Sequence, residues 1–584
     1  WLGDFNTGSM LILDEAHNAA PASASQYAID SQLTQTVRDV APRFEHKLFL
    51  SATPHNGHSN SFAALLEMLD PQRFCRGVPV KSKKLLDSVM VRRLKRDLRE
   101  IGDRDFPQRE VIPLSIDGLP RDAPELLLSR LLKDYREARE QRLKDRPKSQ
   151  RRTSMLVVTS LQKRLLSSIE AFARTLNVHR QALERQQQRR TSTTLIPSQN
   201  RPNFALLRES VGAEDDRAEL SEVEVEAEEN AQMTAASQAD EGGITEQEQN
   251  LLNRMTEIAN RARHQPDARI KRLIAWIQEN LCPNLGETGA TWGDRRLLIF
   301  TEYTDTKRYL EQQLQQAIAG SSQENARIGS FHGGMGDDRR EAIKRAFNAP
   351  PSDHPLRILI ATDAAREGIN LQNYCADLFH FDIPWNPSRM EQRNGRIDRK
   401  LQRAPLVRCY YFTLPQRAED RVLDVLVRKT DTIISELGSL SPVVEKNISE
   451  LFDDGIDHGD QLRLALDEVD QRDERTQRHL GSIREELDVV RPEVAQLRQQ
   501  EQTLQNLLRD AQQWLGLDAQ QFRETLSAAL ELLGASPLTP LNPEQAAQNP
   551  EQAPWQFPQL SELTGDATWA ETLDSLREPR PSGQ

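Results

Sequence analysis

Short β-rich segments recur in two parts of the chain, residues 10–115 and 295–415. They lie at 11–13, 47–50, 297–300, 357–361, 378–381 and 407–412. Stretches with helical periodicity, such as 304–319 and 337–348, lie between them. Apolar strands that alternate with helices are typical of a parallel sheet covered on both faces. The pattern therefore predicts an α/β fold with two parallel-sheet lobes and a helical insertion between them.

Beyond residue 420 the pattern becomes helical, and apolar residues fall on a 3–4 alternation between 480 and 515 that only Glu501 interrupts. Such a heptad seam predicts an internal antiparallel hairpin, which we favour, or an intermolecular coiled coil. Pro492 removes a backbone donor and would kink the helix. Residues 535–584 are rich in Pro, Gln and Asn, which predicts a loosely ordered tail or the start of another unit.

Composition narrows the class of protein. The chain has 584 residues, of which 37% are hydrophobic and 28% charged, so it exceeds one hydrophobic core and should divide into several units. No apolar run approaches the roughly 18–20 residues of a membrane-spanning helix, which excludes a membrane protein. The four cysteines lie far apart without a C-x-x-C pair. This excludes a disulfide scaffold and a cysteine zinc site, and favours the cytoplasm.

The net charge of −12 conceals two opposed blocks. Residues 211–247 hold 12 acidic residues against one basic residue, which predicts a disordered acidic insert over 206–250. Residues 121–190 hold 18 basic residues against 8 acidic ones, within a helical insertion at 116–205. This basic block either lies along nucleic-acid phosphates or forms a solvated helix face. On the first interpretation, neutralising Arg151, Arg152, Lys163 and Arg164 would weaken binding.

Two adjacent carboxylates, Asp14 and Glu15, follow the apolar segment 11–13. At the carboxyl edge of a parallel sheet, where α/β proteins bind ligands, Asp14 would hold Mg²⁺ and Glu15 would activate the water that attacks a γ-phosphate. Ser51 and Thr53 follow the next β-rich segment and would report nucleotide state to a nucleic-acid groove, or simply form a turn.

The second lobe carries polar residues after each predicted strand. They include Thr301-Glu302-Tyr303, the glycines of 331–335, and the segments 360–371 and 391–399. Arg396 and Arg399 are three residues apart, which predicts that they share one helical face. Across a cleft from Asp14 and Glu15 they would neutralise charge on a transferring phosphoryl group. Arg393 instead has a structural alternative, an ion pair with a neighbouring acid.

Taken in order, DEAH, SATP, TEYT, FHGGM, ATDAAREGINL and QRNGRIDR resemble motifs II to VI of superfamily 2 helicases. The His-Asn-Gly after SATP, Trp385-Asn386-Pro387 and Gln402 fit the Swi/Snf-type branch, whereas Leu401 departs from the Gly common there. Within that branch the chain resembles relatives of the RNA-polymerase-associated ATPase. It looks most like the Swi/Snf-like helicase of bacterial DISARM anti-phage systems, over 44–74, 90–98, 161–176 and 564–580.

This resemblance implies two RecA-like lobes, of which 1–115 is the C-terminal part of the first and 251–420 the second; 421–534 would be a helical region. It implies an ATP- and Mg²⁺-dependent translocase on double-stranded DNA, with other defence proteins as possible partners. The implied residues are Glu15, Arg396 and Arg399 for catalysis, Asp14, Gly368 and Gln392 for nucleotide binding, and Ser51, Thr53, Thr301 and Thr362 for coupling to nucleic acid.

The phosphate-binding loop of such a motor is missing, since none of the 27 glycines is followed by Lys. Residue 1 is Trp, and in the family this loop precedes the DEAH strand. We therefore expect a fragment of an active ATPase that is inactive alone; a natural pseudo-enzyme is the alternative. An RNA-directed helicase, and a non-catalytic scaffold that recruits partners through the acidic insert and heptad seam, remain as competing functions.

Overall fold

The structure is a computed structural model. It describes residues 9–14, 16–20, 32–51, 59–76, 85–86, 88–91, 106–191, 205–208, 220–239, 243–364, 370–437, 452, 455–456, 499, 503–504, 506–507, 519–532, 535–541 and 555–556. The chain divides into two compact units, residues 1–92 with 105–490 and residues 93–104 with 491–584. Each part is described by itself.

The N-terminal part contains a parallel pair of strands, β1 (Met10–Leu13) and β2 (His46–Phe49), in which Leu13 is in register with Phe49. Its helical elements are η1 (Ala16–Ala19), α1 (Gln32–Val40), η2 (Ala41–Arg43) and α2 (Ser59–Leu69). Small and aliphatic side chains from these helices form a core against the strands. Both strands were predicted from their β-rich segments, and their parallel pairing is confirmed.

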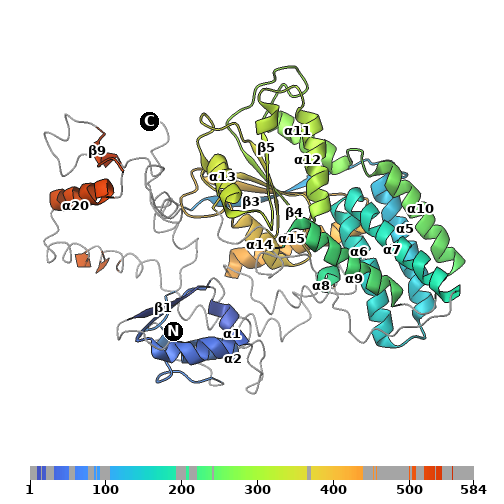
Figure 1. The fold of residues 1–584 in the computed structure, drawn as a ribbon, viewed down its shortest axis with the longest axis horizontal. Coiled ribbons are helices and arrows are strands. Elements are labelled where there is room, and N and C mark those ends of the chain that lie inside the picture. The colour runs from blue at the N-terminus through green and yellow to red at the C-terminus, as the bar shows by residue number, and fades with distance from the viewer. Residues whose placement is uncertain are drawn as a thin grey trace. The chain divides into compact units, whose positions relative to one another are not determined.

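A larger, entirely parallel sheet has six strands in the order β3-β8-β7-β4-β6-β5 (Figure 1). The strands are β3 (Gln108–Ser115), β4 (Leu297–Thr301), β5 (Ile328–Phe331), β6 (Ile358–Thr362), β7 (Asp377–His380) and β8 (Leu406–Thr413). All residues of β4, β6 and β7 are buried, as the uninterrupted apolar pattern predicts.

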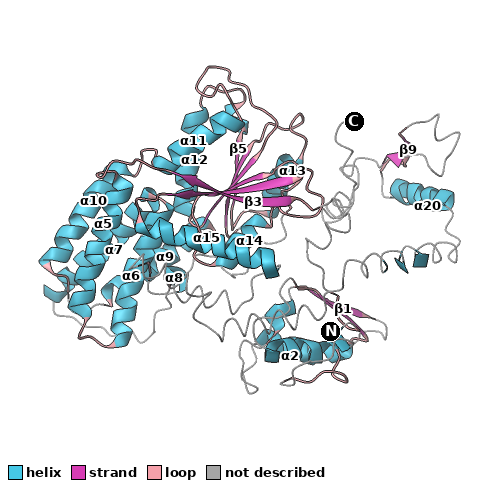
Figure 2. Cartoon of the chain, turned by 180° about the vertical axis from the view of Figure 1, so that it is seen from behind, coloured by secondary structure: helices cyan, strands magenta, loops and turns pink. Residues whose placement is uncertain are grey.

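Helices cover both faces of this sheet (Figure 2). On one face, α11 (Ala268–Asn280) and α12 (Thr304–Ile318) pack on alternate strand residues such as Leu297 and Ile299. On the other face, α13 (Asp337–Asn348) contributes Phe347 to a core with Leu298 and Phe300. A short η4 (Glu324–Ala326) precedes β5. The predicted α/β fold class is confirmed, and α13 has the bounds expected from the sequence.

Strand β3 corrects one boundary of the sequence analysis, which placed 108–115 in the first lobe. It pairs in parallel with β8 over its whole length and forms an edge of the large sheet. Pro113, which has no N–H to donate, is tolerated in such an edge strand. The polar residues at the start of β3 hide it from a search for continuous apolar runs.

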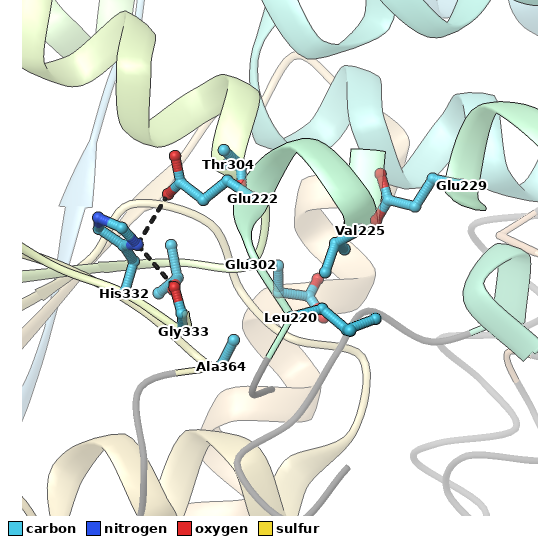
Figure 3. Close-up of a pocket in the computed structure, with 10 residues that line it drawn as sticks. Leu220, Glu222, Val225, Glu229, Glu302, Thr304, His332, Gly333 and Ala364 are labelled. Atoms are coloured by element: carbon cyan, nitrogen blue, oxygen red, sulfur yellow. Dashed lines mark hydrogen bonds and ion pairs between the residues drawn. The ribbon is translucent and has the colours of Figure 1, made fainter. Parts of the chain in front are cut away.

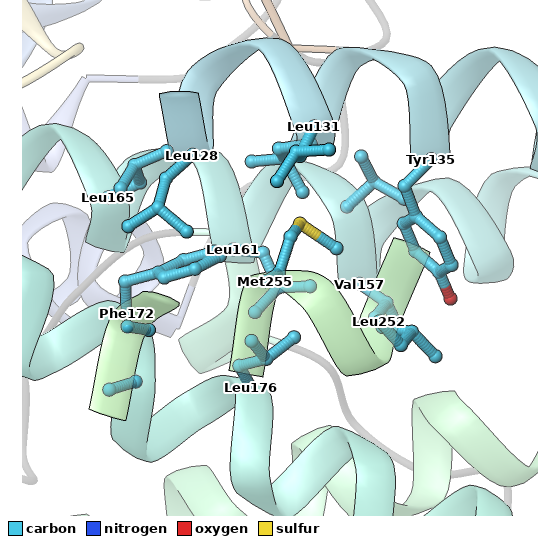
Figure 4. Close-up of a cluster of buried hydrophobic side chains, with 14 of the residues drawn as sticks. Leu128, Leu131, Tyr135, Val157, Leu161, Leu165, Phe172, Leu176, Leu252 and Met255 are labelled. Atoms are coloured by element: carbon cyan, nitrogen blue, oxygen red, sulfur yellow. The ribbon is translucent and has the colours of Figure 1, made fainter. Parts of the chain in front are cut away.

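The insertion between β3 and β4 is a helical bundle. Its helices are α5 (Pro124–Leu143), α6 (Lys148–Ser167), α7 (Ile169–Thr191), α8 (Ala205–Arg208), α9 (Glu222–Gln238) and α10 (Glu246–Ala262). Leu128, Leu161, Phe172, Leu252 and Met255 belong to its continuous apolar core (Figure 4). The helical insertion predicted from the sequence is therefore confirmed.

The prediction of disorder for the acidic block is wrong for 222–238 and 246–250, which are helical. Both α9 and α10 begin with a capping box, Ser221 with Glu224 and Thr245 with Glu248. Met233 and Ala236 of α9 are buried in the bundle core. Disorder was predicted from the negative charge of the block alone. In the fold, cations on other helices pair with these glutamates and neutralise that charge.

After β7 the chain forms α14 (Pro387–Asn394), β8 and α15 (Ala418–Leu437). The segment around Phe452 and Ile456 packs against α15 and α6, and the side-chain amide of Gln162 exchanges two hydrogen bonds with the backbone of Ile456. This contact connects the region after the sheet to the helical bundle.

The second unit contains α20 (Ala519–Leu532) and a short antiparallel pair, β9 (Thr539–Pro540) with β10 (Trp555–Gln556). Of the heptad positions, Leu504 alone lies within the described residues, so the predicted hairpin stays a prediction. Within the described ranges, no helix combines the length and apolar character that crossing a membrane requires.

Candidate active site

The carboxyl ends of three adjacent strands of the large sheet carry polar residues. β4 ends in Thr301, with Glu302 next, and β6 ends in Thr362, with Asp363 next, while Asp382 follows β7 by two residues. Because β7, β4 and β6 are neighbours and parallel, all of these residues lie at one edge. This edge is the usual ligand-binding side of a parallel α/β sheet.

Asp382 is the centre of this edge. Its carboxylate accepts hydrogen bonds from the Thr301 hydroxyl at 2.5 Å, the Glu302 backbone N–H at 2.9 Å and the Ser167 hydroxyl at 2.5 Å. Ser167 is the last residue of α6, so the helical bundle is tied directly to the strand ends. Thr301, predicted to couple to nucleic acid, is therefore buried in a network that connects the sheet with the insertion.

Arg393 of α14 makes the strongest ion pair of the edge. Its Nε lies 2.5 Å from Oδ1 of Asp363 and its Nη2 lies 2.7 Å from Oδ2. Nη1 donates to the backbone oxygen of Asp382 at 2.8 Å. Burial opposes the charged guanidinium, but the two carboxylates outweigh it and raise the pKa of Arg393 above its ordinary value. The structural alternative considered for Arg393 is the one observed.

Arg396 and Arg399 lie beyond α14, which ends at Asn394, so their predicted placement on one helical face is wrong. Gly395 caps the helix, and a turn carries both arginines. Arg396 is buried, while the Arg399 guanidinium donates to Gly395 O at 2.7 Å and to the Asn370 side chain. Gln392, predicted to contact nucleotide, is exposed.

The same segment is fixed from the opposite side by Arg109 of β3, which the sequence analysis did not single out. One guanidinium nitrogen lies 2.8 Å from Glu391 and 3.4 Å from Asp398, and the other lies 3.3 Å from Asp431 of α15. Glu391 is 282 residues away in sequence, so no local pattern signals this contact. Arg109 thus positions the turn that carries Arg396 and Arg399.

A small pocket of about 30 Å³ lies over the strand ends and beneath the start of α9 (Figure 3). It is lined by Leu220, Glu222, Val225, Glu229, Glu302, Thr304, His332, Gly333, Thr362 and Ala364. Ligand sites for small molecules usually measure some 300 Å³ or more. In this arrangement the pocket is too small for a nucleotide. The predicted coupling residue Thr362 is among its walls.

Carboxylates in and beside this pocket have perturbed acidity. Burial raises the pKa of Glu302 to about 7, and the charges of Asp382 and Asp363 add to the effect. Burial also raises the pKa of Asp305 to about 6, with Glu226 and Glu229 of α9 contributing. At this edge, burial and neighbouring carboxylates therefore disfavour the ionised forms of Glu302 and Asp305.

The basic block of the insertion does not present a uniform cationic face. Arg164 is buried, with Nη2 at 2.8 Å from Glu229 and its guanidinium over the ring of Tyr303. Lys163 lies over the ring of Trp385. The proposed use of Arg164 for direct phosphate contacts is therefore wrong in this arrangement, whereas Arg151 and Arg152 are exposed.

In the N-terminal part, Asp14 is exposed directly after β1, and Ser51 is half-buried after β2. Because Leu13 and Phe49 are in register, both residues lie at the same strand ends. An exposed carboxylate at this position suits Mg²⁺, which keeps several waters and binds one or two carboxylates. The described residues contain no group of three His, Cys, Asp or Glu side chains arranged to hold a metal.

Three predicted residues, Glu15, Thr53 and Gly368, lie outside the described residues. Asp14 follows strand β1 of the small sheet, whereas Arg396 and Arg399 lie in the turn after α14, beside the large sheet. That they close around one triphosphate stays a prediction.

Residues 280–400 match the family described as Helicase conserved C-terminal domain. This range contains β4 to β7 and α12 to α14, and thus the polar edge and its arginines. Four of the six strands of the large sheet, β4 to β7, thus lie in a segment that is similar to this helicase family.

Two relatives extend this similarity. The chain is 32% identical over 183 residues to "Uncharacterized ATP-dependent helicase YqhH" of Bacillus subtilis (strain 168), which is 30% of this chain and 30% of the relative. It is 30% identical over 126 residues to "RNA polymerase-associated protein RapA" of Vibrio parahaemolyticus, which is 22% of this chain and 11% of that protein. The matches thus span less than a third of either relative.

A solved structure, "Crystal structure of the C-terminal part of Fun30 ATPase domain", aligns with 59% of this chain and 98% of its own. The TM-score is 0.30 and the sequence identity 13%.

Proposed function

We propose that the chain belongs to an ATP-dependent DNA translocase or helicase of the Swi/Snf type, which hydrolyses ATP between two parallel-sheet lobes. The observation that carries this proposal is the polar edge of the helicase C-terminal domain. There, Arg393 pairs with Asp363 at the end of β6, and the turn with Arg396 and Arg399 follows directly. Guanidinium groups held rigidly beside a ligand-binding edge are suited to stabilise a phosphoryl transition state.

The proposed roles follow the sequence motifs. Asp14 would hold Mg²⁺, Glu15 would activate the attacking water, and Arg396 with Arg399 would stabilise the transferring phosphoryl group. Gly368 and Gln392 would contact the nucleotide. Ser51, Thr53, Thr301 and Thr362 would couple its state to the nucleic acid, and Thr301 supports this role by joining the strand end to the insertion through Asp382.

A phosphate-binding Gly-Lys loop is required for this chemistry, and the printed sequence has no Gly followed by Lys. We therefore expect the 584-residue chain by itself to hydrolyse ATP negligibly, and its motifs to act together with such a loop in the whole protein. Double-stranded DNA is the proposed track, and the resemblance to the DISARM helicase makes anti-phage defence in the cytoplasm the proposed setting.

The test is the ATPase rate of the whole protein with and without duplex DNA. Arg396→Ala should lower the stimulated rate by about 10³-fold or more, as loss of an arginine finger does elsewhere. Arg261→Ala is the matched control, because Arg261 is an exposed arginine that pairs with Glu257 on its own helix. Glu15→Gln should stop turnover while ATP still binds.

Unchanged turnover in Arg396→Ala would remove this arginine from catalysis. Stimulation by RNA but not by duplex DNA would replace the proposal with an RNA-directed helicase, and absence of ATPase activity in the whole protein would favour a scaffold.

A further inference from the structure

The first half of α9 lies across the carboxyl edge of the large sheet. Leu220 and Glu222 approach the loop after β5, where the backbone of Leu220 contacts Gly334 so closely that a Cβ on Gly334 would collide with its carbonyl oxygen. Gly334 also has φ +68°, a conformation that favours glycine. Gly334 of the FHGGM motif is thus in close contact with the residues that lead into α9, while Gly333 lines the pocket beside Glu222 (Figure 3).

Three glutamates on one face of α9 pair with cations from other elements. Glu222 pairs with Lys307, Glu226 lies 2.8 Å from Arg308, and Glu229 lies 2.8 Å from Arg164. The i, i+4, i+7 spacing places the three carboxylates in one row.

Successive members of this row are about 6 Å and about 4.5 Å apart along the helix axis, at 1.5 Å per residue. A row of negative charges at that spacing therefore occupies the edge.

The cations that face Glu222 and Glu226 come from two helices. Lys307 and Arg308 lie near the start of α12, three and four residues after the TEYT motif. Arg174 lies on α7, with Nε at 2.7 Å from Glu170 and Nη1 at 3.5 Å from Glu226. We call Arg174, Lys307 and Arg308 the cation strip. Next to the strip, Nδ1 of His332 lies 3.3 Å from Glu222. Arginine forks and a lysine ammonium are the groups that bind phosphate oxygens in proteins.

The two halves of α9 are held differently. Its buried residues, Gln232, Met233, Ala236 and Ser237, all lie in the second half. In the first half, Val225 packs on Leu206 and Ala364, and the other contacts are ion pairs and the capping box. The ion pairs of Glu226 are partly exposed and are screened by salt, whereas Lys307 and Arg164 are buried and need another anion wherever Glu222 and Glu229 move away. A polyanion can therefore displace the first half while the second half stays anchored in the bundle.

We propose that the cation strip is a binding site for the phosphate backbone of nucleic acid, and that Glu222 and Glu226 of α9 occupy it and compete with that ligand. This inference rests on the proposed function. It specifies which residues bind the nucleic acid and which residues compete with it for the same site. Exchange of two carboxylates for two phosphates keeps the cations paired and releases counterions from the nucleic acid.

The first experiment measures binding of a fluorescent 30-base-pair DNA duplex by anisotropy at fixed salt, with the whole protein. The double substitution Glu222→Gln, Glu226→Gln should tighten binding about tenfold, equivalent to about 1.4 kcal/mol. The matched control is Glu224→Gln, Glu228→Gln, which removes the same charge from the same helix; Glu224 bonds to Ser221 in the capping box, where Gln also serves, and Glu228 accepts a hydrogen bond from Gln232. The control should change the affinity by less than about twofold.

A second pair of variants tests the cations. Lys307→Ala with Arg308→Ala, placed in the Glu222→Gln, Glu226→Gln background, should weaken binding and reduce the slope of log affinity against log salt by about two, one for each lost phosphate contact. Hydrogen exchange should show faster exchange at 222–229 when duplex is added, with 232–238 unchanged.

The outcomes separate the two levels of the argument. If the whole protein binds duplex DNA and both double glutamine variants bind it equally, α9 does not compete and this inference is overturned while the function stands. An unchanged salt slope in the alanine variant overturns the strip as the phosphate site. If no variant binds duplex DNA and DNA does not stimulate ATP hydrolysis, the proposed function fails with it.

Discussion

In the helical bundle, Leu161, Phe172 and Leu252 are fully buried among other apolar side chains. At the carboxyl edge of the sheet, the buried side chains are Arg393, Asp363 and Asp382, connected by ion pairs and hydrogen bonds. Apolar packing depends little on pH or salt, whereas a buried charge is tolerated only while each partner is present. The bundle core therefore contributes stability through apolar packing, whereas the carboxyl edge of the sheet holds charged groups in defined positions.

The largest effect should come from removing the centre of the edge. Arg393→Met leaves Asp363 and Asp382 buried without their cation, and such a loss costs about 3–5 kcal/mol of unfolding free energy. Urea denaturation at pH 7 measures it. Because protonation relieves an unpaired carboxylate, the deficit should shrink as the pH is lowered toward 4. A deficit that is the same at both pH values would show that packing, and not charge, is what Arg393 supplies.

A substitution in the bundle core should instead cause a loss of stability that does not depend on pH or salt. Leu252→Ala opens a cavity in a fully buried apolar site and should cost about 3 kcal/mol. The same urea titrations at pH 4 and 7, and at low and high salt, should give the same loss within error. Val223→Ala, at an exposed position of α9, is the control, since 71% of Val223 is exposed. A strongly pH-dependent loss at Leu252 would contradict the distinction between the two regions.

The same distinction explains what the sequence predicted. Uninterrupted apolar strands such as Leu297–Thr301 are recognisable because burial on both faces leaves a local signature. Thr301 and Thr362 lie at one edge because the parallel strands β4 and β6 end together, and Arg393 makes the ion pair with a neighbouring acid that the sequence left open for it. Sequence reasoning could not supply the partners. Arg109 meets Glu391 across 282 residues, and the helix that Glu222 begins is ordered by cations such as Lys307, 85 residues away.

Charge counting failed for a related reason. The acidic block looked disordered because its own composition lacks apolar residues, but Glu226 and Glu229 pair with arginines of α12 and α6. Two blocks that the sequence analysis treated separately neutralise one another in the fold. The composition of a segment indicates how much conformational entropy it loses on ordering. The ion pairs that offset this loss come from segments that are distant in sequence, so they depend on the topology of the fold.

The smallest and most diagnostic effect should come from Glu302, whose carboxyl lies at this edge with a pKa of about 7. Between pH 4.5 and 7 the folded protein holds this proton more tightly than the unfolded chain, so the free energy of unfolding falls as pH rises through that window. Glu302→Gln cannot ionise and escapes this loss. The variant should therefore gain stability relative to the unsubstituted protein as pH rises, by about 1–3 kcal/mol at pH 7, with little further change above it.

Thermal unfolding of both proteins at half-unit steps from pH 4.5 to 8 measures the difference. Glu257→Gln, an exposed helical glutamate, should show no such trend. If Glu302→Gln instead loses stability relative to the unsubstituted protein as the pH rises, a cationic partner stabilises ionised Glu302 more than burial destabilises it.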